Sequence, residues 1–263
     1  MPPNQRKIGK PIRVVVFGGG PGLERGMKLF LSRLEIHPEI ELTGCFCQSV
    51  GQSFGAMVQD LWKRRRFLAL PVLVIQTWRG IGRFISKPSF EIELKRMFTR
   101  ISHKIHFVQD IHASTVIDQV CSIAPELGLV YGSPILGPEL FQIPRFGTLG
   151  IHHGKLPDYR GKKTTFWAMF NGAETAGVTI QRINAGLDTG DIVKQAEIPI
   201  RGRSFQAVWR DVEELGLDLY IQAILEVKNG VATYQRPAGK KGRLYRDPKL
   251  SDLLKFWWRN DIV

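Results

Sequence analysis

Cysteine is scarce in this chain, with three residues among 263. Cys45, Cys47 and Cys121 are too few and too unevenly spaced for a disulfide framework or a four-ligand zinc site, so we expect a reducing compartment. The six histidines are scattered and lack metal-ligand spacing, so we expect no metal. The N-terminal twenty residues contain no long apolar stretch, which argues against a signal peptide or a membrane span. We therefore predict a cytoplasmic protein with a flexible tail at residues 1–11.

Acidic residues are few relative to basic ones, 24 against 37, and the formal net charge is +13. Residues 61–104 hold eleven Lys or Arg and two Glu, and residues 236–263 hold eight Lys or Arg and three Asp. The remainder is about neutral, so the basic character belongs to two local surfaces. Such surfaces attract phosphates, acidic lipids or nucleic acid.

Residues 61–88 combine basic side chains with an apolar run, Phe67 to Ile75, which is too short to span a bilayer. We interpret this segment as an insertion that packs on the domain or at a homodimer contact. The alternative is an interfacial segment that holds the protein at the inner face of the membrane.

Apolar β-branched runs alternate with amphipathic segments along the chain. Strand patterns occur at IRVVVF, IELTGCFC, KIHFV, ELGLVYG and FGTLGIH, and a helix pattern occurs at STVIDQVCSI. This alternation predicts an α/β fold, an open and mostly parallel sheet with helices on both faces. GVTIQRI and DIVKQAEIPI are close enough to pair antiparallel, and a long amphipathic helix follows, with Ser204 as N-cap and Gly230 as its stop.

The glycine cluster Gly18 to Gly22 follows the first predicted strand. A strand-to-helix turn there would expose backbone N–H groups to a phosphate, but the spacing is not GxGxxG. We therefore interpret the cluster as a tight turn and do not favour a dinucleotide site.

Two adjacent histidines occur in GIHHGKLPDYRG, residues 150–161, where a predicted strand ends at the carboxyl edge of the sheet. Open α/β sheets place their ligand crevices at this edge. Strand alternation puts Gly150 and His152 on one face and His153 on the other. His152 is therefore the histidine that we expect to face the crevice.

A second turn, NAGLDTGDIV, supplies Asp188 and Asp191 within glycine-flanked backbone that a substrate can approach closely. An aspartate beside an imidazole fixes its tautomer and supports its protonated form. A pairing with this turn would make His152 a proton shuttle.

The string HHGKLPDYRG followed by WAMFNGAETAGVTIQRINAGLDTGDIV resembles the signature of the folate-dependent formyltransferases. These include methionyl-tRNA, glycinamide ribonucleotide and nucleotide-sugar N-formyltransferases. The resemblance is densest from Gly147 to Pro199, and it implies a formyltransferase-type sheet over residues 12–230. It also implies 10-formyltetrahydrofolate as co-substrate and an amine as acceptor. Residues 231–263 would form a short basic and aromatic C-terminal extension.

The resemblance implies a catalytic set of an Asn-x-His motif and the first aspartate of the LDTGD turn. His152 and Asp188 match the histidine and the aspartate, but Gly150 stands where the family has asparagine. Losing one oxyanion donor typically costs about 10²–10³ in rate. We therefore hypothesise a non-standard oxyanion site in which Thr148, His153 or a bound water substitutes for the amide.

The resemblance also suggests binding residues, although each could equally be core or solvated surface. Folate would lie against apolar walls and exposed amides. The expected folate contacts are Val130, Tyr131, Gly132, Ser133, Ile135, Leu136, Asn184 and Gly186, and the expected acceptor contacts are His153, Lys155, Tyr159 and Arg160.

The basic surfaces favour a small or nucleotide-linked acceptor, most plausibly an amino sugar. Transfer RNA is disfavoured because a tRNA formyltransferase is expected to carry a larger C-terminal β domain than the residues after the long helix would supply. The alternatives are a catalytically weakened relative that binds folate or a partner, and a hydrolase that passes the formyl group to water.

Overall fold

The computed structural model describes residues 9–19, 25–48, 99–237 and 242–260, and the structural statements below concern these residues. The predicted insertion at 61–88 lies outside them, as do residues 1–8 of the predicted tail and residues 20–22 of the glycine cluster. Within the described part of the chain, no helix is long and apolar enough to cross a membrane.

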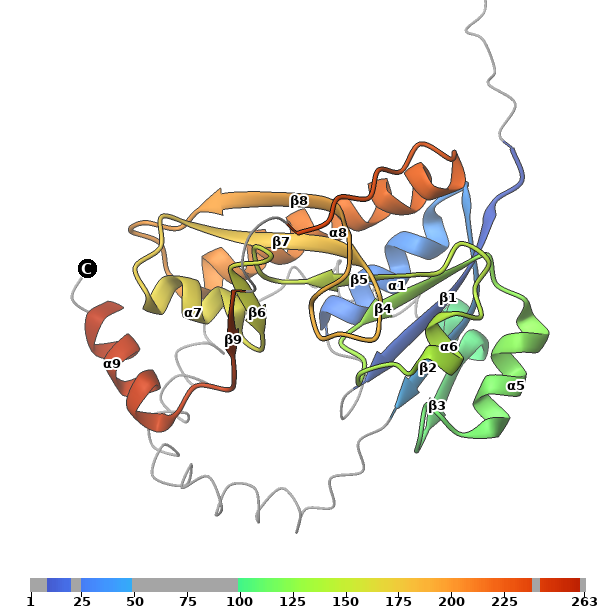
Figure 1. Cartoon of the computed structure of the whole chain (residues 1–263), viewed down its shortest axis with the longest axis horizontal. Coiled ribbons are helices and arrows are strands. Elements are labelled where there is room, and N and C mark those ends of the chain that lie inside the picture. The colour runs from blue at the N-terminus through green and yellow to red at the C-terminus, as the bar shows by residue number, and fades with distance from the viewer. Residues whose placement is uncertain (1–8, 20–24, 49–98, 238–241, 261–263) are drawn as a thin grey trace, which may run out of the picture.

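Seven strands form one mixed sheet in the order β3-β2-β1-β4-β5-β7-β8 (Figure 1). The strands are β1 Ile12–Gly19, β2 Ile40–Gln48, β3 Ile105–Val108, β4 Leu127–Tyr131, β5 Thr148–His152, β7 Thr175–Arg182 and β8 Ile192–Pro199. The first five run parallel, whereas β7 lies antiparallel to β5 and β8 antiparallel to β7. The predicted α/β class and the predicted antiparallel pair are both confirmed.

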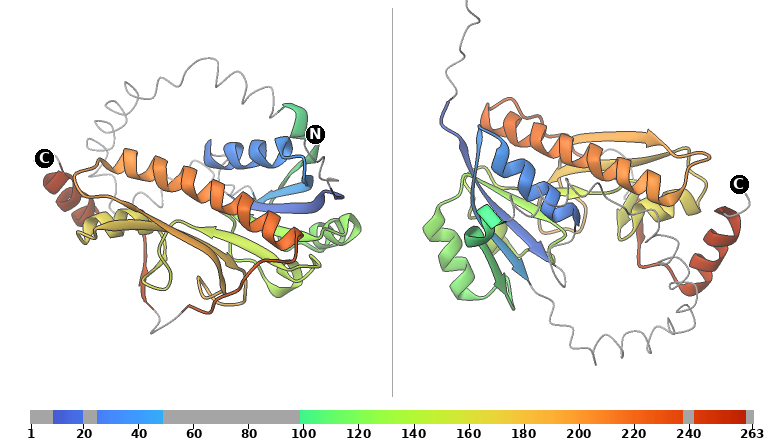
Figure 2. Two further views of the ribbon diagram at one scale, coloured as in Figure 1. Left: turned by 90° about the horizontal axis from the view of Figure 1, so that it is seen from above. Right: turned by 180° about the vertical axis from the view of Figure 1, so that it is seen from behind.

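Helices cover both faces of the sheet. Helices α1 (Arg25–Ile36) and α8 (Phe205–Lys228) lie on one face, and α5 (Ser114–Ile123) and α6 (Pro138–Phe141) lie on the other (Figures 1 and 2). The bounds of α5 match the predicted helix. In α8 the Ser204 side chain accepts a hydrogen bond from the Ala207 N–H at 3.4 Å, and Gly230 follows with φ +68°, so the predicted N-cap and stop are also confirmed.

The hydrophobic core lies in two main layers, one between the sheet and α1 and α8, the other between the sheet and α5 and α6. Tyr220 of α8 is fully buried, and its hydroxyl contacts the backbone of two neighbouring strands. It accepts from the Val130 N–H at 2.9 Å and donates to the Leu149 carbonyl at 2.8 Å. A Cβ at Gly216 would lie 2.8 Å from Ile151, so this glycine allows α8 to approach the sheet closely.

A smaller group of elements lies at the end of the sheet away from α5. It contains β6 (Tyr159–Gly161), α7 (Thr164–Phe170), β9 (Arg243–Tyr245) and α9 (Leu250–Asn260). Strands β6 and β9 pair in parallel as a second sheet, and α9 packs through Phe256 against Phe166 of α7. The described part of the C-terminal extension therefore folds back onto the loop that follows β5.

Candidate active site

His152 and Asp188 meet at the carboxyl end of β5. His152 is the last residue of β5, and Asp188 lies in the turn between β7 and β8, the strands that continue the sheet beyond β5. Imidazole Nδ1 is 3.4 Å from carboxylate Oδ1, and the side chains are only 8% and 12% exposed. Two stretches far apart in the sequence thus form one buried acid–base pair.

The partners of His152 determine which ring nitrogen titrates. Nε2 is 2.7 Å from the Tyr159 carbonyl oxygen, and because a carbonyl can only accept, Nε2 carries the hydrogen. Nδ1, which faces Asp188, is therefore the nitrogen that gains or loses a proton. Burial lowers the pKa of His152 below its ordinary value, and the Asp188 carboxylate opposes this effect only in part.

The carboxylate of Asp188 is held from two directions. Oδ2 accepts from the Gly161 N–H of β6 at 2.7 Å, and Oδ1 accepts from the Gln181 amide of β7 at 3.2 Å. The backbone of Asp188 has φ +49°, a left-handed conformation that aspartate tolerates better than most residues. Arg160 donates to the carbonyls of Leu187 and Asp188 and fixes the turn further.

Gly150 lies between Val130 of β4 and Gln181 of β7 in the sheet register. A Cβ at this position would be 2.6 Å from Ile183 Cδ1 and 3.6 Å from Val130 Cβ, so the Ile183 side chain occupies the space beside the glycine. Val130 and Ile183 pack against the hydrophobic cluster under α5 and α6, to which the buried Leu136 belongs. Val130, an expected folate contact, and Ile183, which precedes the expected contact Asn184, thus lie together beside Gly150.

The turn after Ile183 is ordered by its own hydrogen bonds. Asn184 accepts from the Gly186 N–H at 2.9 Å and from the Thr189 hydroxyl at 2.9 Å, and its own amide donates to the Thr189 carbonyl. An apolar wall next to an ordered, exposed turn suits a flat ring with hydrogen-bonding edges. The residue types beside Gly150, apolar side chains followed by an ordered turn, are those that a folate ring requires.

The other expected folate contacts lie in the loop after β4 or on the other side of the sheet. Gly132 and Ser133 lie in this loop, where Ile135 is 69% exposed. The Tyr131 hydroxyl instead donates to the Glu213 carboxylate on the α8 side of the sheet. The Tyr131 side chain therefore lies on the opposite face of the sheet from the side chains of Val130 and Leu136.

His153 also lies on the α8 side. Its Nε2 is 2.8 Å from Glu213 Oε2, and its ring lies 5.0 Å from that of Trp209. Burial opposes ionisation of Glu213, but the adjacent His153 imidazole and a hydrogen bond from the Tyr131 hydroxyl hold the pKa of this carboxyl below its ordinary value. His153 is therefore engaged on the side of the sheet opposite to Gly150.

Thr148 lies two residues before Gly150 in β5 and so shares the strand face of Gly150 and His152. Its hydroxyl is buried and donates to the Phe141 carbonyl at 2.9 Å. Neither Thr148 nor His153 is therefore placed to replace an amide at position 150, contrary to that part of the hypothesis.

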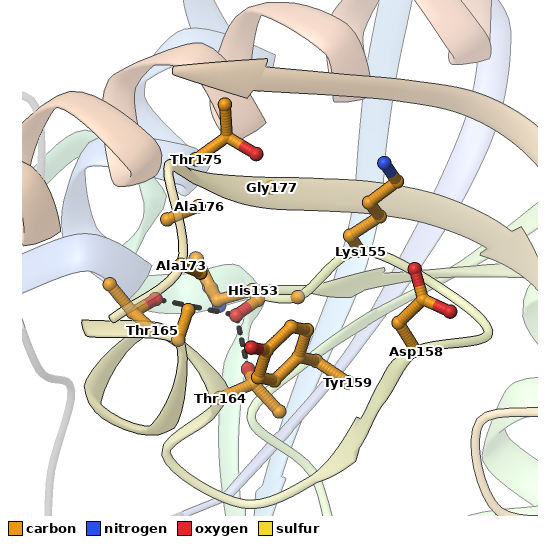
Figure 3. Close-up of a pocket in the computed structure, with 12 residues that line it drawn as sticks. His153, Lys155, Asp158, Tyr159, Thr164, Thr165, Ala173, Thr175, Ala176 and Gly177 are labelled. Atoms are coloured by element: carbon orange, nitrogen blue, oxygen red, sulfur yellow. Dashed lines mark hydrogen bonds between the residues drawn. The ribbon is translucent and has the colours of Figure 1, made fainter. Parts of the chain in front are cut away.

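A cavity of about 140 Å³ lies between the loop 153–159, α7 and the start of β7. Figure 3 shows Lys155 and Tyr159 at its rim and the Thr164 and Thr165 hydroxyls directed at the His153 carbonyl. The lining residues are His153, Gly154, Lys155, Asp158, Tyr159, Thr164, Thr165, Ala168, Ala173, Thr175, Ala176 and Gly177.

Three of the four expected acceptor contacts line this cavity. His152 is not among the lining residues, but its Nε2 partner Tyr159 is, and a Cβ at Gly154 would lie 2.6 Å from that nitrogen. The fourth expected contact, Arg160, is directed to the Asp188 turn instead. Lys155 pairs with Glu197 at 2.7 Å and stays partly exposed.

Sequence analysis missed Gln181 and Glu213. Both are polar residues inside apolar patterns: Gln181 continues the face of β7 that carries Thr179, and Glu213 lies on the buried stripe of α8 with Gly216 and Tyr220. A buried polar residue in such a pattern is the available signal, because it needs a partner. In the described ranges, no group of three or more His, Cys, Asp or Glu could hold a metal ion.

Comparison with known proteins places this geometry in context. The formyl transferase family model matches residues 86–224. A methionyl-tRNA formyltransferase from Thermodesulfovibrio yellowstonii is 30% identical over 186 residues, which is 69% of this chain and 58% of that protein. The chain thus spans less than two thirds of that relative's length.

Solved structures share the fold at low identity. Glycinamide ribonucleotide transformylase 1 from Symbiobacterium toebii has a TM-score of 0.57 at 16% identity. The superposition covers 84% of this chain and 90% of the transformylase chain. A sugar N-formyltransferase from a Shewanella species has a TM-score of 0.59 at 14% identity. The superposition covers 93% of this chain and 86% of the sugar N-formyltransferase chain. The sheet and helices around His152 thus follow the architecture of these proteins.

Proposed function

The chain belongs to the formyl transferase family, and we propose that it transfers a formyl group from 10-formyltetrahydrofolate to an amine on a small, nucleotide-linked acceptor. The observation that carries this proposal is the buried His152–Asp188 pair beside the apolar wall at Gly150. The other functions of the sequence analysis, a weakened folate binder and a hydrolase, remain outcomes of the test below.

Formyl transfer to an amine requires a proton acceptor. As the amine nitrogen bonds to the formyl carbon, it must lose a proton, and the leaving nitrogen must gain one. We assign both transfers to His152 Nδ1, because Nε2 is held by the Tyr159 carbonyl. Asp188 Oδ1 stabilises the imidazolium between the two transfers.

Folate is assigned to the wall formed by Val130, Leu136 and Ile183 and to the turn of Asn184 and Gly186. When bound, it supplies the formyl group. These residues provide an apolar surface beside Gly150 and a turn held by its own hydrogen bonds. Their part in the mechanism is to orient the donor and to exclude water from the carbon under attack.

The acceptor is assigned to the cavity beside Tyr159. Its lining combines a cation, Lys155, with a carboxylate, Asp158, and several hydroxyls. Such a lining suits a polar small molecule with hydroxyl groups and a phosphate, and a nucleotide-linked amino sugar carries both.

An aminoacyl-tRNA is the second candidate acceptor. The observation that favours it is the name shared by the curated relatives, methionyl-tRNA formyltransferase. The C-terminal residues 236–263 also carry an excess of Lys and Arg, which suits a polyanion such as RNA as well as a nucleotide.

Release of tetrahydrofolate from 10-formyltetrahydrofolate distinguishes these candidates. We expect fast release with nucleotide-linked amino sugars, slow release without an amine, and no stimulation by methionyl-tRNA. Stimulation by methionyl-tRNA alone would identify tRNA as the acceptor, and equal release with and without amines would indicate a hydrolase. Folate binding without release would indicate a non-catalytic relative.

A further inference from the structure

Gln181 lies directly opposite Gly150 in the sheet. The two residues are register partners in the antiparallel pair of β5 and β7, so their side-chain positions share one face. Gln181 is 5% exposed. On this face the glycine contributes no polar group, and the adjacent strand contributes a carboxamide.

The contacts of Gln181 fix the orientation of its amide. Oε1 accepts from the Gly190 N–H at 3.1 Å, and Nε2 donates to Asp188 Oδ1 at 3.2 Å. The same carboxylate oxygen lies 3.4 Å from His152 Nδ1. A carboxamide nitrogen has two hydrogens, and the contact with Asp188 uses one of them.

Other side-chain donors near the dyad have partners of their own. The Thr148 hydroxyl donates to Phe141, and the Thr179 hydroxyl donates to the Gly154 carbonyl at 2.7 Å. The guanidinium of Arg160 donates to the carbonyls of the Asp188 turn. Among the described residues beside His152, Gln181 thus combines a fixed amide, deep burial and an N–H beyond the one used by Asp188.

We propose that Gln181 is the oxyanion donor of this site, with its second N–H directed to the formyl oxygen during transfer. This inference rests on the proposed function. As the new C–N bond forms, the formyl oxygen gains negative charge, and as the old C–N bond breaks, it returns to a carbonyl. Gln181 donates to this oxygen throughout, and the proton moves from the amine to His152 and then to the leaving nitrogen. A fixed N–H in a site that excludes water stabilises such charge without reorganisation.

Replacing the amide by an apolar group of similar length tests the proposal. Gln181→Met should lower kcat about 10²–10³-fold, the range for loss of one oxyanion donor, with the KM of the acceptor little changed. Gln195→Met is the matched control, because it removes a partly buried amide of β8 that donates to Leu156 and Thr179. This control should keep kcat within a few-fold of the parent, and thermal melting should show both variants folded.

Moving the amide to the neighbouring strand provides a rescue. Asparagine at position 150 needs room at Ile183 Cδ1, which valine provides. In the Gln181→Met background, Gly150→Asn with Ile183→Val should therefore recover kcat by at least tenfold over Gln181→Met. No recovery in a folded triple variant would count against a donor role for the amide.

The pH profile separates a donor from a residue that only positions Asp188. If Gln181 is the donor, the acid limb of kcat/KM in Gln181→Met does not move to lower pH, because the Asp188 carboxylate that raises the pKa of His152 is still present. If the limb moves as in Asp188→Asn, or if kcat is unchanged, the proposal is overturned. A wild-type protein that neither formylates an amine nor hydrolyses 10-formyltetrahydrofolate would overturn the proposed function as well.

Discussion

His152 is held at both ring nitrogens by groups from different segments. Tyr159, seven residues later, holds Nε2, and Asp188, in the turn after β7, faces Nδ1. Burial disfavours the imidazolium and the carboxylate favours it. A histidine balanced in this way is neutral at neutral pH and can accept a proton.

The acid limb of the pH profile follows from this balance. Because the pKa of His152 is lowered, kcat/KM should rise with pH through an apparent pKa below the ordinary histidine value of about 6.5 and then level off. Asp188→Asn removes the group that raises this pKa, so the limb should move to lower pH while the plateau falls. Steady-state kinetics between pH 4.5 and 8 measures both effects, and a limb that moves upward in Asp188→Asn would contradict the assignment.

Local patterns predicted His152 and the turn that holds Asp188 and Asp191, and the resemblance to the formyltransferases singled out Asp188. A strand that ends in His152 and a glycine-flanked turn at Asp188 both belong at a sheet edge, and the structure brings them together. Gln181 could not be found in this way, because its proximity to Gly150 depends on the register of β5 with β7. The engagement of His153 by Glu213 depends likewise on how α8 crosses the sheet.

Among the elements, α8 stabilises the junction of β4 and β5 through the Tyr220 hydroxyl. This group accepts from the Val130 N–H and donates to the Leu149 carbonyl in a fully buried position. Burial raises the pKa of Tyr220 far above its ordinary range, so it remains a neutral donor. These two strands carry Gly150 and the wall assigned to folate.

Tyr220→Phe should destabilise this junction. It leaves the Val130 N–H and the Leu149 carbonyl without the hydroxyl, at a cost of about 1–3 kcal/mol in the free energy of unfolding. Urea unfolding measures the change, with the 40% exposed Tyr234→Phe as matched control. Equal stability of the two variants would show that the buried hydroxyl contributes nothing.

The strands of the main sheet and the helices that pack on it could be predicted from the spacing of their apolar residues. The bounds of α5 and the antiparallel pair β7–β8 are examples. The pair β6–β9 could not be predicted, since each strand has three residues and the pairing joins segments about eighty positions apart. Such short strands carry no alternation and form through tertiary packing.

At the scale of the whole molecule, the C-terminal extension is linked to the site. Tyr245 of β9 stacks on Tyr159 at 5.3 Å, and Tyr159 holds His152. Helix α9 then docks through Phe256 on Phe166, with ring centroids 4.7 Å apart. The α/β class followed from composition and alternation, whereas this return of the chain depended on aromatic contacts between distant segments. The division into domain and extension stays a prediction.

Phe256→Ala should release α9 from this contact. Its ring is partly exposed, so the loss should be smaller than the about 3–5 kcal/mol of a buried phenylalanine, yet enough to speed proteolytic cleavage between residues 246 and 260. Trp258→Ala, a matched control at a 70% exposed position, should leave the cleavage rate unchanged. Mass spectrometry of the fragments measures both rates, and equal rates would contradict docking through Phe256.

The most direct measurement is a single turnover of 10-formyltetrahydrofolate with an amine acceptor, comparing His152→Gln with His103→Gln. His103 lies on a short 3₁₀ helix, Ser102–Lys104, away from the dyad, and is exposed. We predict a loss of at least about 10²-fold in the transfer rate for His152→Gln and an unchanged rate for His103→Gln. Transfer at the wild-type rate in folded His152→Gln would contradict the assignment of proton transfer to this imidazole.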